Sequence, residues 1–213
     1  MTKKKEEMLV EQMKELKEQM AILTEAVKGL TATMEGRKRS EKKKEIKWTD
    51  DQTDQRKNFA TMIKVSAALK DVYKLGMMKK AKRDQVKPRD MFKKLNKGYF
   101  ERGEVKWEKL QLSWGSVSEV RIKGAERTEE GKVRVRYEST GKSVMEGDYM
   151  YVCMVCEETL KSNMMRGKMS EGEGVFDVPK DWKGGKLHIY AFAYSSVDDK
   201  FSKTTYWKME EER

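Results

Sequence analysis

The sequence predicts an α+β protein in which an N-terminal parallel coiled coil and a short helical region precede a C-terminal antiparallel β-sandwich of immunoglobulin or fibronectin type. Residues 1–36 carry an unbroken apolar heptad, residues 48–104 carry apolar positions at helical spacing, and from about residue 105 the apolar period changes to two. A chain of 213 residues can hold one ordinary domain with an appendage. We therefore expect a coiled coil (1–36), a basic hinge (37–47), a basic helical region (48–104) and a β-sandwich (105–209).

Leucine recurs at every seventh position of the first segment, with methionine or valine between. The predicted seam is Leu9, Met13, Leu16, Met20, Leu23, Val27, Leu30 and Met34. Because one helix cannot bury such a row, we expect it to pair with further copies of the chain. The flanking positions are mostly uncharged and three seam positions hold methionine, so a dimer and a trimer both stay open. A lone helix docked on its own domain is the alternative. Gly36 is expected to end the helix.

Helix signals return after residues 37–47. Thr49 and Gln52 have the spacing of a capping box, which predicts a helix that starts there and stops at Gly76. Pro88 suits the first turn of a shorter helix. The predicted strands then follow at residues 119–122, 132–137, 149–156, 186–194 and 203–209.

The net charge of +11 is concentrated in the first half of the chain. Lys and Arg outnumber Asp and Glu by 15 to 8 in residues 48–104, whereas residues 105–213 have 19 of each. The candidate binding cluster is Lys79, Lys80, Lys82, Arg83, Lys87, Arg89, Lys93, Lys94 and Lys97. Such clustering attracts an acidic protein surface or nucleic acid, although a merely solvated face is the other interpretation.

Several separated motifs in the second half resemble a known family. They are Thr49-x-x-Gln52-x-x-Gln55-Arg56-x-x-Phe59-Ala60, Gly76, Ser113-x-Gly115, Pro179-x-x-Trp182-x-Gly184-x-x-x-His188-x-Tyr190-x-Phe192, Asp199-Lys200-x-Ser202 and Tyr206. Over residues 49–206 the chain resembles a bacterial family of about 200 residues known only as a domain of unknown function. The resemblance implies a helical region followed by a β-sandwich, with no known activity, cofactor or catalytic residue. Members usually begin with a glycine-rich segment, which the coiled coil replaces here.

The candidate chemical groups are few. Cys153 and Cys156 have the spacing of a metal knuckle, but residues three apart in a strand point to opposite faces, so we expect two core thiols. His188, the only histidine, shares a strand face with Tyr190 and Phe192, where it can line a groove or sit hydrogen-bonded in an inter-sheet core.

Two further motifs lack the sequence context that their known functions require. Gly141-Lys142-Ser143 lacks the earlier glycine of a phosphate-binding loop and lies between predicted strands. In leucine-zipper transcription factors the basic helix precedes the zipper, whereas here the basic run follows it.

The sequence therefore predicts a non-enzymatic structural or interaction protein that oligomerises through its coiled coil and docks into a larger assembly, with a phage virion as one such assembly. The alternative is a nucleic-acid-associated protein that binds phosphates non-specifically. We expect no cofactor, metal or small-molecule substrate. The absence of an apolar N-terminal stretch or a membrane-length apolar run predicts a cytoplasmic protein, or one within a phage particle, that is not secreted by a signal peptide.

Overall fold

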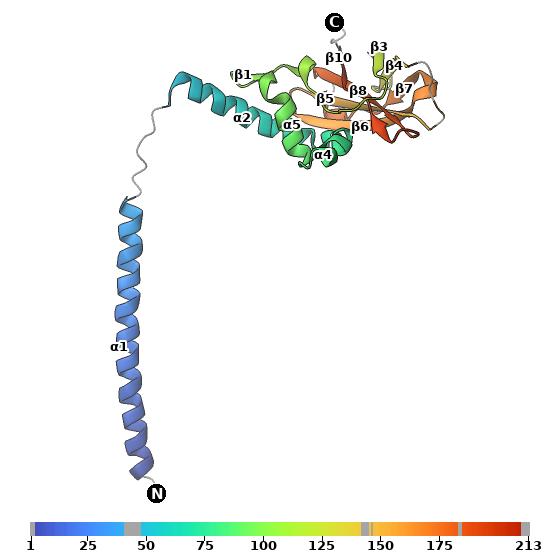
Figure 1. The fold of residues 1–213 in the computed structure, drawn as a ribbon. Helices are drawn as coiled ribbons and strands as arrows, with labels where there is room; N and C mark the ends of the chain where they lie inside the picture. Colours follow the sequence, from blue (N-terminus) through green and yellow to red (C-terminus); the bar gives the residue numbers. More distant parts are fainter. Residues whose placement is uncertain (1–2, 41–47, 142–144, 146, 183–184, 210–213) are drawn as a thin grey trace. The chain divides into compact units, whose positions relative to one another are not determined.

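The computed structural model describes residues 3–40, 48–141, 145, 147–182 and 185–209, and within the first helix the side chains of residues 8 and 10–31. The chain divides into two compact units, Met1–Trp48 and Thr49–Arg213. The first contains helix α1, and the second contains the other helices and all described strands (Figure 1). The predicted α+β class, with an N-terminal helix and a C-terminal antiparallel β region, is confirmed.

Helix α1 spans Lys3–Ser40 without interruption. The prediction that Gly36 ends this helix is wrong, because the helix continues through it. A glycine inside a helix costs only about 1 kcal/mol relative to alanine, which good helix formers on both sides can offset. The first four residues of the predicted hinge are thus helical, and residues 41–47 lie outside the described residues.

Four helices open the second unit. Helix α2 (Asp50–Ala68) starts at the predicted capping box, in which the Gln52 amide donates to Thr49 Oγ1 at 3.3 Å and the Thr49 amide donates to Gln52 Oε1 at 3.1 Å. The single helix expected up to Gly76 is instead interrupted at Leu69, and its second part ends at Gly76 as predicted. The remaining helices are α3 (Lys70–Gly76), α4 (Met78–Arg83) and α5 (Pro88–Asn96), with Pro88 in the first turn of α5 as predicted.

Two short strands, β1 (Phe100–Glu101) and β2 (Glu104–Val105), pair after the helices. The main strands are β3 (Val120–Arg127), β4 (Val133–Ser139), β5 (Tyr149–Cys156), β6 (Lys161–Lys168), β7 (Glu173–Phe176), β8 (Leu187–Ser195), β9 (Lys200–Phe201) and β10 (Thr205–Met209). They form a three-stranded sheet, β3-β4-β7, and a five-stranded sheet, β10-β8-β5-β6, in which β9 also pairs with β8. All pairings are antiparallel. Strands β6, β7 and β9 were not predicted.

The five-stranded sheet is covered on both faces. Met150, Val152 and Met154 share one core with Val133 and Val135 of the three-stranded sheet. The opposite face contributes Cys153, Val155, Tyr190 and Phe192 to a second core with residues of α2, α3 and α5 (Figure 1). The aromatic row of β8 therefore faces the helical layer, which corrects the expectation that it lies between the two sheets.

The helices and the sheets consequently share one core. Val65 of α2, Leu69 between α2 and α3, and Phe92 of α5 are at most 1% exposed and belong to the same cluster as Tyr190 and Phe192. The predicted basic helical region (48–104) and β-sandwich (105–209) thus form a single compact unit, so residue 105 marks a change of secondary structure and no domain boundary.

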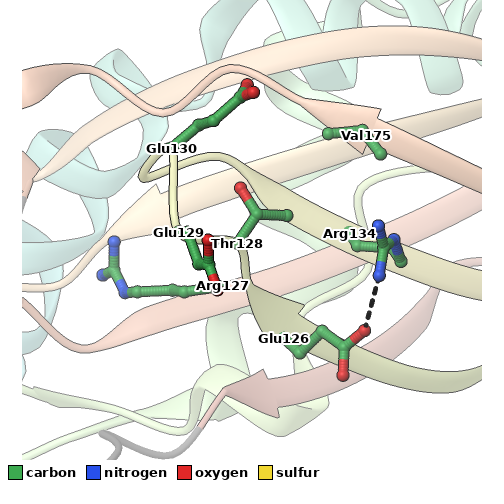
Figure 2. A pocket seen from close by; sticks show the side chains of 7 residues that line it. All are labelled: Glu126, Arg127, Thr128, Glu129, Glu130, Arg134 and Val175. Carbon is green, nitrogen blue, oxygen red and sulfur yellow. Dashed lines mark hydrogen bonds and ion pairs between the residues drawn. The ribbon is translucent and has the colours of Figure 1, made fainter.

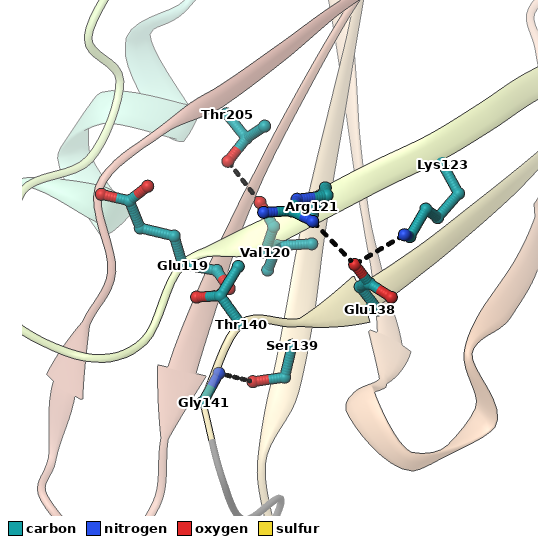
Figure 3. Close-up of polar contacts among 9 residues, drawn as sticks. All are labelled: Glu119, Val120, Arg121, Lys123, Glu138, Ser139, Thr140, Gly141 and Thr205. Carbon is teal, nitrogen blue, oxygen red and sulfur yellow. Dashed lines mark hydrogen bonds and ion pairs between the residues drawn. The ribbon is translucent and has the colours of Figure 1, made fainter.

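A hydrogen bond between β3 and β10 joins the two sheets along one side. The Thr205 hydroxyl on β10 donates to the Val120 carbonyl on β3. On the outer face of the three-stranded sheet, Glu138 of β4 binds Lys123 at 2.8 Å and Arg121 at 3.4 Å (Figure 3). This face is polar and exposed, which is why β3 and β4 alternate in burial while β5 and β8 do not.

Candidate functional site

Helix α1 carries a row of apolar side chains that are exposed in the single chain. From Met13 through Leu16, Met20, Leu23 and Val27 to Leu30, the exposed fraction runs from 53% for Val27 to 65% for Leu23 and Leu30. Leu9 and Met34, the predicted ends of the seam, lie outside the described side chains. Since the row repeats with a heptad period along an unbroken helix, the helix presents one continuous apolar stripe.

The positions beside this stripe carry little charge. Thr24 and Thr31 donate their hydroxyls to the carbonyls of Met20 and Val27, four residues earlier, at 2.7 and 3.0 Å. These hydroxyls are therefore satisfied within the helix and need no partner at an interface. Ile22 is 71% exposed and lies outside the heptad row, so apolar exposure on α1 is not confined to the seam.

The basic cluster lies mainly on α4 and α5, and part of it is paired with carboxylates. Lys80 binds Asp84 at 2.6 Å, Arg83 lies 3.5 Å from the same carboxylate, and Lys79 binds Asp199. The hydrogen bond from Lys80 holds the pKa of Asp84 below its ordinary value. The pairing of Lys79 with Asp199 joins α4 to the turn after β8.

The other predicted cations differ in their surroundings. Lys93 lies over the ring of Phe59, 5.5 Å from its centre. The remaining members are exposed, and among the described residues they form no ion pair: Lys82, Lys87, Arg89, Lys94 and Lys97. The positive surface is therefore supplied mostly by the segment around α5, while α4 is partly neutralised.

His188 is buried, only 3% exposed, and both of its ring nitrogens have partners. Nε2 lies 3.1 Å from a Glu157 carboxylate oxygen and Nδ1 lies 2.9 Å from the Tyr206 hydroxyl. An ionised carboxylate can only accept, so the neutral imidazole donates from Nε2 to Glu157 and accepts the Tyr206 hydroxyl at Nδ1. The Trp107 ring stacks on the imidazole, with centres 4.5 Å apart. His188 is thus a hydrogen-bonded core residue, but it lies on the face of β8 that meets the helical layer, so the predicted position between the two sheets is wrong.

The surroundings of His188 also set its proton affinity. Burial lowers the pKa of His188 below its ordinary value of 6.5, and the Glu157 carboxylate opposes this shift only in part. Sequence reasoning did not identify Trp107 and Glu157 as neighbours, because they come from a 3-10 turn and a loop that show no periodicity.

The two cysteines lie on opposite faces of β5, as predicted. Cys153 belongs to the core beneath the helices, whereas Cys156 belongs to the core between the sheets, and both are at most 1% exposed. Burial raises the pKa of the Cys153 thiol far above its ordinary value, which keeps it a neutral thiol. Among the described residues, no group of three or more His, Cys, Asp or Glu side chains is arranged to hold a metal ion.

A hollow of about 570 Å³ lies beside the turn between β3 and β4 (Figure 2). It is lined by Glu126, Arg127, Thr128, Glu129, Glu130, Arg134 and Val175. Arg134 binds Glu126 at 3.3 Å, and Arg127 lies 3.4 Å from the carbonyls of Trp182 and Gly185. Both arginines of this hollow therefore already bind other groups of the chain.

The comparisons with known proteins leave the candidate sites to be interpreted from their own geometry. None of the described helices combines the length and apolarity that crossing a membrane requires. No protein-family model, curated protein or solved structure matches the chain. The resemblance to a family of unknown function therefore stays an expectation.

Proposed function

We propose that the protein is a non-enzymatic structural or interaction protein, in which α1 assembles two or three copies as a parallel coiled coil and the Thr49–Arg213 unit docks into a larger assembly. A phage particle is one assembly of this kind. The observation that carries the proposal is the apolar heptad row of α1, whose described members are all more than half exposed. Coiled-coil pairing would bury this row by inserting each side chain between four residues of the facing helix.

The strand order supports a fibronectin-like sandwich as the docking module. If β3, β4, β5, β6, β7, β8 and β10 are taken as strands A, B, C, C′, E, F and G, one sheet is A-B-E and the other is G-F-C-C′. Domains of this architecture commonly present faces and loops to protein partners. Here helices cover the G-F-C-C′ face, so the A-B-E face and the loops at the ends are the surfaces available to a partner.

The state of the chemical groups supports a non-enzymatic role. Both ring nitrogens of His188 are hydrogen-bonded, one to Glu157 and the other to Tyr206, and Cys153 is fully buried. A general base needs a free lone pair within reach of a substrate proton, and a nucleophilic cysteine needs access and thiolate character. Neither condition is met by these groups in the folded chain.

Cysteine cross-linking tests the parallel arrangement. In a parallel, in-register coiled coil, Met13 of one copy faces Met13 of the next, whereas Glu11 points away from the seam. We expect Met13→Cys to form a covalent dimer on mild oxidation and Glu11→Cys to remain largely monomeric on a denaturing gel, since the natural cysteines are buried. Equal cross-linking at both positions, or none at Met13→Cys, would reject a parallel seam.

A second candidate function is non-specific binding of nucleic acid. The exposed cations around α5 favour it, because lysines without intramolecular carboxylates remain available to phosphates. Copurifying nucleic acid, seen as excess absorbance near its ultraviolet maximum, would support this function over the first.

A further inference from the structure

A second hollow, of about 330 Å³, lies where α4 meets the segment before β3 and strand β9. Its lining consists of Lys79, Lys80, Arg83, Trp114, Gly115, Ser116, Lys200 and Phe201. The cations come from α4 and from β9, which are more than 100 residues apart in the sequence. Sequence reasoning placed three of these cations in a basic cluster but did not connect them with Trp114 or Lys200.

The side chains that line the hollow include several cations. Four of its lining residues are cations and none is a carboxylate. Asp84 and Asp199 bind Lys80, Arg83 and Lys79 from outside the lining, and Asp198 lines a neighbouring hollow with Asp148. A lysine ammonium has three donors and an arginine guanidinium has five, so these ion pairs position the cations and still leave donors for a ligand.

Hydrogen bonds fix the backbone segment that carries Trp114. The Trp114 amide donates to the Gly76 carbonyl at 3.0 Å, and Ser113 Oγ donates to the Ser202 carbonyl at 2.9 Å. Thr204 Oγ1 accepts the amide of Ser113 at 2.8 Å. A pocket whose backbone is fixed before binding loses little conformational entropy when a ligand enters.

Gly115 brings the two walls together. A Cβ added to it would lie 1.6 Å from the Phe201 carbonyl oxygen, so only glycine allows the segment before β3 to lie this close to β9. This contact holds the backbone next to Trp114 against strand β9, whose two residues Lys200 and Phe201 line the hollow.

Trp114 adds an aromatic surface to the cations. Its side chain is half-buried, and Lys203 Nζ lies 5.9 Å from the ring centre. An aromatic ring beside several cations is the combination that recognises a base together with its phosphates, because the base stacks while the cations neutralise the phosphates. The volume falls at the lower end of the range for small-ligand pockets.

We propose that this hollow binds a nucleotide unit, with its phosphates on Lys79, Lys80, Arg83 and Lys200 and its base against Trp114. The nucleotide can be free or part of a single strand, because both present the same base and phosphate chemistry. The site goes beyond the proposed assembly function and does not depend on α1, since every residue in it lies in the Thr49–Arg213 unit.

The test is isothermal titration calorimetry of the full chain with three probes: ATP, inorganic pyrophosphate and a short oligothymidylate. The double variant Arg83→Gln/Lys200→Gln removes two lining cations, and Trp114→Leu removes the ring. Lys94→Gln and Phe59→Leu are the matched controls, because both change exposed residues outside the hollow. Circular dichroism melting confirms that each variant is folded before titration.

We expect the double variant to weaken binding of ATP or of the oligonucleotide by about tenfold or more. Trp114→Leu should weaken the same probe but leave pyrophosphate unaffected, and both controls should retain binding. Binding of ATP identifies a free nucleotide, and binding of the oligonucleotide alone identifies a strand.

Three results would overturn the proposal. They are no binding of either nucleotide probe, binding that survives the double variant, or pyrophosphate binding as tight as ATP with no effect of Trp114→Leu. A loss of oligonucleotide binding in Lys94→Gln, with the hollow variants unaffected, would assign nucleic-acid binding to the surface around α5 and would also reject the hollow. None of these outcomes depends on whether α1 forms a coiled coil.

Discussion

At the scale of single residues, His188 shows how burial fixes the chemistry of a side chain. Its imidazole is enclosed by Trp107, Tyr206 and Glu157, and burial lowers its pKa below 6.5. Protonation would place a proton on Nδ1, where the neutral ring accepts the Tyr206 hydroxyl, so that hydroxyl would have to turn. The folded state therefore favours the neutral ring.

This environment predicts a pH dependence of stability. The unfolded chain binds a proton at His188 near pH 6.5, whereas the folded chain binds it only at lower pH. The free energy of unfolding should therefore fall as the pH drops from 6.5 toward the lowered pKa of the folded state. Urea denaturation at a series of pH values should show this loss in the natural chain.

The variant His188→Gln isolates that contribution. Glutamine keeps hydrogen-bonding capacity but cannot titrate, so the variant should be less stable at neutral pH while its stability changes less between pH 6.5 and more acidic values. An identical pH profile in the two proteins would show that His188 does not titrate differently in the folded and unfolded states.

Gly115 gives a second prediction at this scale. Because an added Cβ would lie 1.6 Å from the Phe201 carbonyl oxygen, Gly115→Ala must push the two walls of the hollow apart. We expect a loss of about 1–3 kcal/mol in the free energy of unfolding, the usual cost of overpacking. Gly98→Ala is the control, since no atom lies within 4 Å of its added Cβ. Denaturation midpoints that shift equally in the two variants would contradict this account of Gly115.

At the scale of elements, local signals predicted helices well where they act within one turn. The Thr49 and Gln52 side chains close the capping box as their spacing predicts, and Pro88 begins α5. The prediction that Gly36 ends α1 is wrong because a glycine ends a helix only when its backbone adopts the left-handed conformation. The sequence alone does not determine which conformation a glycine adopts. The break at Leu69 has no Gly or Pro signal at all.

The strands show what one-dimensional patterns leave out. Strands β5 (Tyr149–Cys156) and β8 (Leu187–Ser195) are nearly continuous apolar runs. Such runs are typical of strands that are covered on both faces. This pattern indicates that both faces of the sheet are covered, but it does not specify that helices cover one of them. Strand β6 (Lys161–Lys168) lacks the apolar alternation because it lies at the edge of its sheet and is only partly buried.

The segment around α5 carries the prediction for polyanion binding. Lys94 and Lys97 are exposed, so Lys94→Glu/Lys97→Glu changes the charge by −4 without opening the core. If the second candidate function holds, this variant should abolish oligonucleotide binding at low salt, and the affinity of the natural chain should fall steeply with salt because counterions are released.

The control for this prediction lies on the β region. Lys123→Glu/Lys168→Glu changes the charge equally on exposed strand positions outside the α5 segment and should leave binding largely intact. Affinity that is independent of salt, or that falls equally in both variants, would reject the α5 segment as a specific polyanion surface.

At the scale of the whole molecule, the chain combines two units that differ in how they bury apolar side chains. In the Thr49–Arg213 unit the aromatic row of β8 is buried within the chain, whereas on α1 the described heptad residues are all more than half exposed. The heptad row could be predicted from the sequence alone, because it depends only on spacing. The hollow around Trp114 could not, because it forms where α4, the segment before β3 and β9 meet through tertiary packing.

The molar mass of the full chain in solution tests the central claim, that the heptad row of α1 assembles the protein. The natural chain should have two or three times the 25.0 kDa of one copy by light scattering. Leu16→Glu/Leu23→Glu places charges in the seam, each costing several kcal/mol when buried unpaired, and should yield a monomer with its β circular dichroism signal retained.

The matched control is Ala21→Glu/Ile22→Glu, which adds the same charge to exposed positions of α1 outside the seam and should keep the natural mass. The account predicts that only the seam variant reaches 25.0 kDa. A natural chain that is already monomeric, or a seam variant that keeps the natural mass, would contradict it.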